Sequence, residues 1–579
     1  MTKPAWLHPS HWPLLAISLR QSGVRCLVLC PGSRNAPITL SLVRSGFFEY
    51  AVGVDERSAG FVALGMSLPR QAPVAVVCTS GTALLNLGPA VAEAFYQRIP
   101  LIIISADRPL GFADHQKGQV IRQNGVFQSH TRSSLCWVNP SDHPSSHDDS
   151  LEALGDLFEI AVQQAGPVHL NIPLQEPLYE IPKPLPGHRD LVEKVTMDAD
   201  SNQSAKTDPP LGLEEAWKNA IGKSQKIWLL AGMGRYPDSI QQTLNSLLKQ
   251  IPSCSLWSEE LANLQPGKRI NEISWNRFPL DAPDLLISWG GPMVSKAVGQ
   301  CLALNPSMHH WRLDPRGDFI DTYNRLDGVW ATPPSLGLER LLDWSSTLPT
   351  QGDPQAIQSV VTILSSNDHD TVHPAVSQLP FSDLWVLGAL KPHLNKAVIH
   401  VGNSSLIRKF LAIPQDPHFQ GIVHCNRGTS GIEGNVSTAL GEALAQKEGQ
   451  DVWLLNGDLA TVYDAGAWLI EPRPMVRVVV FNNHGGDIFR QLPGSSAQEE
   501  CESLFATPRP LQWASWCAGY GLPWRQVRSQ SEWEPALAWL KSQNQSAILE
   551  VNTTIAANRE AERLFALPLL IPQNPKKRP

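Results

Sequence analysis

One stretch, Leu454–Phe489, constrains the fold more than any other. It begins with the apolar pattern of a buried strand, continues with apolar residues at helical spacing, and ends in a second, β-branched strand at 476–481. This order predicts a βαβ unit with parallel strands. Because parallel strands end at the same edge of a sheet, Asp458 and Asn483, 25 residues apart, are expected to lie close together.

The polar groups that follow these two strands suit a hard divalent cation. The Asp458 carboxylate, the Asn483 amide oxygen and the backbone carbonyl of Gly485 are ligands that Mg²⁺ accepts, with phosphate oxygens and water completing its octahedron. Mn²⁺ is the alternative metal for such a set. A strand-end turn also favours Gly, Asp and Asn, so a lone Gly457-Asp458 pair would indicate only a turn. The predicted metal site therefore depends on both loops together.

Composition places the chain among ordinary globular proteins and excludes several functions. Its 579 residues are 42% hydrophobic and 17% charged, enough for roughly three or four domains with full cores. The formal net charge of −7 argues against nucleic-acid binding and a membrane-surface role, since both need a basic face. The chain shows no secretory leader and no run of about 18 apolar residues, so no membrane insertion is expected.

The nine cysteines indicate the compartment. None forms a C-x-x-C pair, and several lie in apolar strand patterns such as 24–30. Buried free thiols in a reducing compartment explain this distribution better than a disulfide framework or a zinc site. We therefore expect a cytoplasmic protein.

Strand and helix patterns alternate along the chain, which predicts an α/β fold of three domains, each a parallel sheet flanked by helices. Two polar, proline-containing passages are predicted to be linkers between them. The expected organisation is a first domain at 1–185, a linker at 186–212, a middle domain at 213–350, a linker at 351–380 and a third domain at 381–579.

Polar or charged residues follow the strands expected in both outer domains. The expected strands lie at 26–30, 50–54, 74–78, 101–105 and a closing 166–173 in the first domain, and at 398–401, 421–425, 452–456, 476–481 and 547–551 in the third. A helix capped by Thr79-Ser80 is expected at 82–97. Ligands bind at the carboxyl ends of parallel strands, so we expect a site shared between the two outer domains.

A Gly-Asp turn followed 25 residues later by Asn-Asn-x-Gly resembles the cofactor signature of thiamine diphosphate-dependent enzymes. That class also has the same order of domains: pyrimidine-binding, Rossmann-like and diphosphate-binding. Within it, the chain resembles the 2-succinyl-5-enolpyruvyl-6-hydroxy-3-cyclohexene-1-carboxylate (SEPHCHC) synthase family. This resemblance covers both outer domains, with the motifs in the same order, and the middle domain only in outline. The motifs that carry it are PGSRNAP, FxxxxxVDERSAG, CTSGTA, SADRP, GQVIRQ, GNSS, NRGTSGIEG and NNHGGDIF.

The resemblance implies that Glu56 is the catalytic residue that activates the cofactor. A carboxyl group in an apolar cleft can keep a proton and share it with N1′ of the aminopyrimidine, which favours the imino form that deprotonates thiazolium C2. From spacing alone, a surface salt bridge with Arg57 is the alternative; the joint occurrence with the metal motif favours catalysis. The implied cofactor-binding residues are Glu56, Ser80, Gly81, Gly457, Asp458, Leu459, Asn483, Gly485 and Ile488.

By resemblance, the enzyme decarboxylates 2-oxoglutarate and adds the succinic semialdehyde carbanion to isochorismate, giving SEPHCHC and CO₂ in menaquinone or phylloquinone biosynthesis. Each substrate carries two carboxylates, which planar Arg side chains bind through paired hydrogen bonds. A single Arg is more often a solvated surface charge, but several cations in the family's motifs are not explained that way. The implied contacts are Ser33, Arg34, Arg108, Gln119 and Lys296 for isochorismate, Ser404, Arg408 and Arg427 for 2-oxoglutarate, and Ile488 and Phe489 over the thiazolium.

The chain departs from the family at two positions. Ala297 follows Lys296 where relatives have a second basic residue, and His484 occupies the variable position of Asn-Asn-x-Gly, which is often small and polar. We expect His484 to fill a loop whose backbone makes the contacts. In the family, Glu56 of one subunit meets the Asp458 loop of another, so the resemblance implies a homodimer at minimum and commonly a homotetramer.

Two other functions fit parts of the pattern. A different thiamine diphosphate-dependent decarboxylase or carboligase, such as an acetolactate synthase, would not need so many carboxylate-binding cations. A non-catalytic protein that retains the fold would be expected to lose Glu56, Asp458 or Asn483, and all three are present. We therefore expect a transferase of the SEPHCHC synthase type, dependent on thiamine diphosphate and Mg²⁺.

Overall fold

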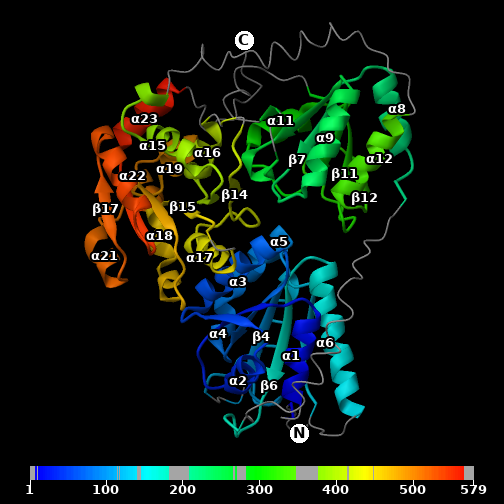
Figure 1. The fold of residues 1–579 in the computed structure, drawn as a ribbon, viewed down its shortest axis with the longest axis vertical. Helices are drawn as coiled ribbons and strands as arrows, with labels where there is room; N and C mark the ends of the chain where they lie inside the picture. Colours follow the sequence, from blue (N-terminus) through cyan, green and yellow to red (C-terminus); the bar gives the residue numbers. More distant parts are fainter. Residues whose placement is uncertain are drawn as a thin grey trace.

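The computed structural model contains three six-stranded sheets, one in each third of the chain (Figure 1). All strand pairs are parallel, and helices cover the sheets, as expected for the α/β class. The structure describes residues 7–8, 11–113, 115, 118–139, 145–180, 208–264, 268–269, 282–346, 376–413, 416, 418–446 and 449–565. Most of the two expected linkers therefore lies outside the described residues. Within them, no helix is long and apolar enough to span a membrane.

The first sheet has the order β2-β1-β3-β4-β6-β5. Its strands are β1 (Cys26–Leu29), β2 (Glu49–Val52), β3 (Val74–Cys78), β4 (Leu101–Asp107), β5 (Ser133–Cys136) and β6 (Val168–Pro173). The helices are α1 (Trp12–Gln21), α2 (Ala36–Ser45), α3 (Glu56–Arg70), α4 (Thr82–Asn86), α5 (Gly88–Gln97) and α6 (Ser145–Gln163), with a 3₁₀ turn at Gln128–His130. The central strands are fully buried because helices pack on both faces.

The middle sheet has the order β12-β11-β10-β7-β8-β9, which is the doubly wound order of Rossmann folds. Its strands are β7 (Ile227–Ala231), β8 (Cys254–Ser258), β9 (Lys268–Arg269), β10 (Leu285–Trp289), β11 (His309–Leu313) and β12 (Leu326–Trp330). The helices are α8 (Leu213–Gly222), α9 (Asp238–Gln250), α11 (Lys296–Leu304) and α12 (Pro334–Ser346), with a 3₁₀ turn at Glu260–Ala262.

The third sheet repeats the strand order of the first, since β14-β13-β15-β16-β18-β17 matches β2-β1-β3-β4-β6-β5 strand for strand. Its strands are β13 (Val398–Val401), β14 (Ile422–His424), β15 (Val452–Gly457), β16 (Arg477–Asn482), β17 (Trp524–Val527) and β18 (Ala547–Asn552). The helices are α15 (Asp383–Leu390), α16 (Ser405–Ala412), α17 (Asn435–Ala445), α18 (Asp458–Tyr463), α19 (Asp487–Gln491), α20 (Pro493–Ser496), α21 (Trp513–Gly519), α22 (Trp533–Lys541) and α23 (Ile555–Leu564). The shorter turns are 376–378, 391–394, 465–469 and 530–532, and a π-helix spans Cys501–Ala506.

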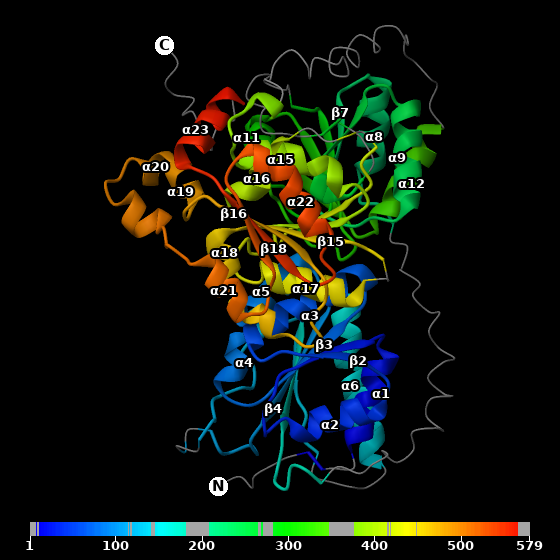
Figure 2. The same cartoon turned by 60° about the vertical axis from the view of Figure 1, so that its left-hand side comes forward.

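Helices α3 and α17 join the two outer domains (Figures 1 and 2). They approach so closely that a Cβ at Gly65 would lie 2.1 Å from the Thr438 carbonyl oxygen, and one at Gly441 would lie 2.0 Å from the Val62 carbonyl oxygen. Glycine is therefore required at both positions by the packing of one backbone on another. Apolar residues of both domains form one continuous core around this contact.

Three sequence-based expectations about the first domain were wrong. The helix expected at 82–97 is two helices, α4 and α5, because Pro89 in the first turn of α5 has no N–H to continue the hydrogen-bond ladder. Its N-cap is Gly81 rather than Thr79-Ser80. The strand at 166–173 does not close the first sheet, since the polar strand β5 lies outside it.

The crossover after Asp458 also differs from the single helix that was expected. It consists of the short α18 and a 3₁₀ turn at Ala465–Leu469, separated by Asp464. The buried Asp464 carboxylate accepts hydrogen bonds from the backbone N–H and hydroxyl of Ser437 and from the hydroxyl of Ser58. Asp464 thus interrupts the helix and links the two outer domains through Ser58 and Ser437.

The close approach of α3 and α17 predicts opposite effects for two Gly→Ala substitutions in helices. Gly441→Ala should destabilise the protein by about 1–3 kcal/mol, because the new methyl group overlaps the Val62 carbonyl. Gly155→Ala in α6 is the matched control: its Cβ meets no atom within 4 Å, so it should stabilise by roughly 0.5–1 kcal/mol. Thermal unfolding midpoints measure both changes, and a neutral Gly441→Ala would contradict the packing.

Candidate functional site

The structure brings together the two loops of the expected metal site. Strands β15 and β16 are parallel neighbours, with Gly457 opposite Phe481, so the loops that follow them emerge side by side. The backbone N–H of Gly485 donates to the Asp458 carboxylate at 2.8 Å. Gly485 has φ +115°, and a Cβ there would lie 2.3 Å from the Ala506 carbonyl oxygen, so only glycine fits.

The Asn483 amide is held in a defined orientation. Its nitrogen donates to the Asp383 carboxylate at 2.9 Å, and the same carboxylate accepts from Lys409 at 2.9 Å and from the Thr553 hydroxyl at 2.9 Å. Because the nitrogen is engaged, the amide oxygen is the atom left to bind a ligand. It accepts no hydrogen bond from any residue that the structure describes. Sequence reasoning missed Asp383 and Lys409, which come from α15 and α16.

Asp458 carries a buried negative charge. Its side chain is 7% exposed. Burial raises the pKa of this carboxyl to about 6, although hydrogen bonds from the N–H groups of Leu459 and Gly485 act in the opposite direction. A divalent cation would compensate the buried charge. Its carboxylate, the free oxygen of Asn483 and the carbonyl of Gly485 therefore fit an oxygen-liganded metal ion.

Arg490, a buried cation in addition to Lys409, also fixes the loop that contains Asn483. Arg490 on α19 donates to the carbonyls of Asn483, at 3.1 Å, and His484, at 2.7 Å, while its other donors pair with Glu502 in the π-helix at 2.8 and 2.9 Å. His484 has φ +62° and an exposed side chain, and its backbone makes the contact. The neighbouring Ile488 and Phe489 are half-buried, and the Phe489 ring lies 6.0 Å from that of Phe505.

Glu56 lies at the carboxyl ends of the first sheet. Asp55 caps α3 by accepting from the backbone N–H groups of Arg57 and Ser58, which places Glu56 at the first position of the helix. Its charge contributes to the raised pKa of the buried thiol of Cys78, which arises mainly from burial. Glu56 is half-buried and forms no hydrogen bond or ion pair with a described residue.

The surface salt bridge between Glu56 and Arg57, which spacing left open, does not form. Arg57 instead donates to the Tyr463 carbonyl at 2.7 Å and lies 4.7 Å from the centre of the Tyr463 ring. The Glu56 carboxylate therefore remains available at the strand ends. In the described part of the chain, no hydrogen bond or ion pair joins it to Asp458 or Asn483.

The loops around Gly81 interlock with the Gln119 loop. The Ser80 hydroxyl donates to the Gln119 carbonyl at 3.0 Å, and the Gln119 side chain donates back to the Ser80 carbonyl at 3.1 Å. The Gly81 N–H donates to the Gln123 side chain at 2.7 Å. Gly81 has φ +84° and Gln119 has φ +58°, so both loops carry left-handed backbone positions at this edge.

Two guanidinium groups approach each other at the same edge. Arg34, 7% exposed, donates to the Leu174 carbonyl at 3.3 Å and to Glu176 at 3.1 Å. Burial and the nearby positive charge of Arg108 lower its pKa. Arg108 donates to the Gly118 carbonyl at 3.2 Å. The exposed Ser33 lies beside Arg34, with its hydroxyl 3.0 Å from that of Tyr179.

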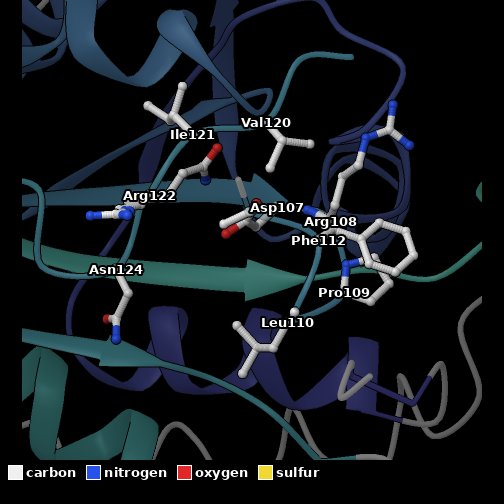
Figure 3. A pocket seen from close by; sticks show the side chains of 12 residues that line it. Asp107, Arg108, Pro109, Leu110, Phe112, Val120, Ile121, Arg122 and Asn124 are labelled. Carbon is white, nitrogen blue, oxygen red and sulfur yellow. Dashed lines mark hydrogen bonds between the residues drawn. The ribbon is translucent and has the colours of Figure 1, made fainter. Parts of the chain in front are cut away.

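A hollow of about 200 Å³ lies next to Arg108 (Figure 3). Its lining combines the polar groups of Asp107, Arg108 and Arg122 with the apolar side chains of Leu110, Phe112, Val120 and Ile121. Asp107 lies between Arg108 and Arg122 in the close-up view. Sequence reasoning did not single out Arg122, although it belongs to the GQVIRQ motif.

The third sheet carries its own pair of arginines. Ser404 has φ +76° and precedes α16, and Arg408 donates to its carbonyl at 2.5 Å. Arg427 follows β14 and donates to the Asn403 side chain at 3.2 Å. Arg408 and Arg427 thus donate to adjacent residues, Ser404 and Asn403. Burial raises the pKa of the Cys425 thiol to about 12, and the charges of both arginines oppose this shift.

Lys296 is exposed at the first position of α11. The loop before it is fixed by the buried Glu259, which accepts from the N–H groups of Val294 at 2.8 Å and Ser295 at 2.7 Å. The structure thus places Lys296 at the start of a helix in the middle domain, directly after a fixed loop.

Comparison with known proteins identifies the class first. Residues 13–130 match the family described as "Thiamine pyrophosphate enzyme, N-terminal TPP binding domain". With three parallel sheets and a site at the strand ends, the chain is a thiamine diphosphate-dependent enzyme.

Whole-length relatives then define the family. The chain is 31% identical to the 2-succinyl-5-enolpyruvyl-6-hydroxy-3-cyclohexene-1-carboxylate synthase of Cytophaga hutchinsonii over 94% of this chain and 96% of the relative. It is 33% identical to the synthase of Flavobacterium johnsoniae, covering 93% and 94%, and 33% identical to that of Desulfotalea psychrophila, covering 87% and 91%. The chain belongs to the SEPHCHC synthase family, as its motifs indicated.

The raised pKa of Asp458 predicts a pH-dependent stability difference in protein without metal. Because the folded state holds this proton up to about pH 6, wild type should lose roughly 2–3 kcal/mol relative to Asp458→Asn as pH rises from about 4 to 7. The difference between the two proteins is the useful quantity, since Asp464 also has a raised pKa, about 6. Unfolding measured at several pH values tests this; parallel curves would contradict a buried charge at Asp458.

Proposed function

We propose that the protein catalyses the thiamine diphosphate-dependent decarboxylation of 2-oxoglutarate and the addition of the resulting four-carbon unit to isochorismate, giving SEPHCHC and CO₂ in menaquinone or phylloquinone biosynthesis. The observation that carries this proposal is the presence of two arginine pairs, Arg34 with Arg108 and Arg408 with Arg427, at the edges of two different sheets. Two separate cationic subsites match two dicarboxylate substrates. The names of the relatives support the same reaction.

Third-domain residues would hold the diphosphate end of the cofactor. Asp458, Asn483 and the Gly485 carbonyl would supply three oxygen ligands for Mg²⁺, or for Mn²⁺ as the alternative, and the metal would offset the charge of the diphosphate. Gly457 and Leu459, which flank Asp458, would contact the cofactor from the same turn. Bound thiamine diphosphate supplies the electron sink that lets a 2-oxo acid lose CO₂ and transfer its remaining acyl carbon.

First-domain residues would act on the pyrimidine end and on isochorismate. The Glu56 carboxyl, which has no hydrogen-bond partner among the described residues, would hydrogen-bond to N1′ of the aminopyrimidine. Ser80 and Gly81 line the same edge. The carboxylates and hydroxyl of isochorismate would be bound by a set of polar side chains: Ser33, Arg34, Arg108, Gln119 and the middle domain's Lys296.

The 2-oxoglutarate subsite would lie over the third domain. Arg408 and Arg427 bind the two carboxylates, and the Ser404 hydroxyl adds a hydrogen bond. Ile488 and Phe489 form an apolar wall that excludes water from the reacting carbon. An enzyme acting on pyruvate would need no second cation at this position.

A second copy of the chain would complete each site. Apolar side chains are exposed on elements that belong to both halves. Val54 (56%) lies two residues before Glu56, and Leu85 (46%) lies on α4. Tyr463 (48%) ends α18, which begins at Asp458, and Leu504 (68%) lies in the π-helix next to the Gly485–Gly486 loop. Such exposure beside a binding site is typical of a surface covered by a partner. We propose a homodimer at minimum, with a homotetramer as a pair of dimers, in which Glu56 faces Asp458 of the partner. The nine free cysteines favour a cytoplasmic location.

The substrate assignment predicts strict dependence on both dicarboxylates. With thiamine diphosphate and Mg²⁺, the protein should release CO₂ from 2-oxoglutarate at least 10-fold faster when isochorismate is present. Pyruvate, which lacks the second carboxylate, should be a poor donor because one arginine would be left without a partner. CO₂ release and isochorismate consumption measure the reaction. Equal turnover of pyruvate alone would favour an acetolactate synthase-like activity instead.

The shared site predicts complementation between two inactive variants. Glu56→Gln and Asp458→Ala should each be inactive as homodimers, because one loses the activating proton and the other the metal. When the two variants are co-expressed, or combined after reversible dissociation, half of the dimers would contain one chain of each. Each of these dimers would keep one intact site. About one quarter of wild-type activity should therefore return. No recovery in verified mixed dimers would show that each site uses both residues from one chain.

A further inference from the structure

Glu93 on α5 connects the first domain to the loop that carries Arg427. The side chain is 1% exposed. Its carboxylate accepts from the backbone N–H of Gly428 at 2.8 Å and from the backbone N–H and hydroxyl of Thr429 at 2.6 and 2.5 Å. These two residues follow Arg427 directly, so one carboxylate fixes the backbone next to an expected substrate ligand.

The loop also lies unusually close to α5. A Cβ at Gly428 would lie 2.6 Å from the Glu93 carbonyl oxygen and 3.1 Å from the Gln97 backbone nitrogen. The Gln97 side chain donates to the same carboxylate at 2.5 Å. Gly428 is thus required by contact with a helix of another domain, and the contact is independent of the hydrogen bonds.

Glu93 is held by neutral donors alone. In the described part of the chain no Lys or Arg pairs with it, and its partners are two backbone N–H groups, a hydroxyl and an amide. Burying a carboxylate without a counter-charge is costly, so the arrangement is a poor means of increasing stability. Hydrogen bonds from backbone N–H groups to a carboxylate are strong and directional. The contacts of Glu93 are therefore well suited to orienting a loop.

The opposite side of the loop is fixed within the third domain. Arg427 donates to the Asn403 side-chain oxygen at 3.2 Å, and the Asn403 nitrogen donates to the carbonyls of Asn426 at 2.6 Å and Gly431 at 2.7 Å. The Arg427 loop is therefore clamped between Asn403 and Glu93. Removing Glu93 would release one side of this clamp.

We propose that Glu93 is a positioning residue for the 2-oxoglutarate subsite, acting through the Gly428-Thr429 backbone to hold Arg427. This inference rests on the proposed function. Glu93 and Arg427 belong to one chain, whereas Glu56 would act at the site of the partner. Each first domain therefore serves both sites of the dimer: one through Glu56 and the other through Glu93.

Steady-state kinetics of the holoenzyme tests the role. Glu93→Ala should raise KM for 2-oxoglutarate by about 10- to 100-fold, since small displacements of a binding group have effects of that size. KM for isochorismate and the affinity for thiamine diphosphate with Mg²⁺ should stay within twofold. Glu93→Gln, which keeps one acceptor, should give a smaller increase. The exposed Glu159 on α6 provides the control Glu159→Ala, which should match wild type.

Thr429 provides a milder probe in case Glu93→Ala does not fold. Thr429→Val removes one hydrogen bond to Glu93 and should raise KM for 2-oxoglutarate by about 2- to 5-fold, while Thr429→Ser should behave as wild type. A purely structural role would lower the unfolding temperature without a selective change in KM, and that result would overturn the proposal. Wild type that fails to consume 2-oxoglutarate with isochorismate would overturn the proposed function as well.

Mixed dimers test the arrangement within the chain. With Glu56→Gln on one chain and Glu93→Ala on the other, the one working site takes its third domain from the Glu56→Gln chain, so KM for 2-oxoglutarate should be wild type. With both substitutions on one chain and a wild-type partner, the working site takes its third domain from the doubly substituted chain, so KM should be raised. The reverse result would overturn the assignment of Glu93 to the site of its own chain.

Discussion

The contact between α3 and α17 is the constraint on which the rest of the structure depends. Gly65 and Gly441 let two helix backbones touch, and this fixes the first domain against the third. Other links between the domains follow from that placement: Ser58 reaches Asp464, and Glu93 reaches the Arg427 loop. A shift of either helix would move all of these together, because packed interiors transmit displacement.

Parallel sheets determine where the chemistry is found. The strands of both outer sheets are parallel, so each sheet presents the loops that follow its strands at one edge. The strand order of the two sheets is also identical. The first edge has Glu56, Arg34 and Arg108; the third has Asp458 and Arg427. The proposed site draws on both edges, and apolar residues exposed on the elements around them led us to propose a second copy of the chain.

Sequence reasoning located the loops that follow neighbouring strands correctly, and it missed the pairs of buried charges. The convergence of Asp458 and Gly485 followed from a short βαβ unit with clear strand patterns. Asp383 and Lys409 were not foreseen because each appears in the sequence as a single charge on an apolar helix, and only tertiary structure shows that they pair. Likewise, Glu93 looks like a solvated helix residue until the loop 335 positions later is placed beside it.

The buried charges around Asn483 keep Asp383 ionised, and Asp383 orients the Asn483 side chain. Lys409 contacts three carboxylates, those of Asp383, Asp487 and Glu562, at 2.8–3.0 Å. Burial raises the pKa of Glu562 to about 7, while Lys409 and hydrogen bonds from Asn483 and Thr553 outweigh burial and lower the pKa of Asp383. Asp383 therefore stays ionised and accepts from the amide nitrogen of Asn483, which leaves the amide oxygen available to the proposed metal ion. Replacing such a buried network by apolar residues would often preserve stability. Its effect is to fix which atom of Asn483 is available to a ligand.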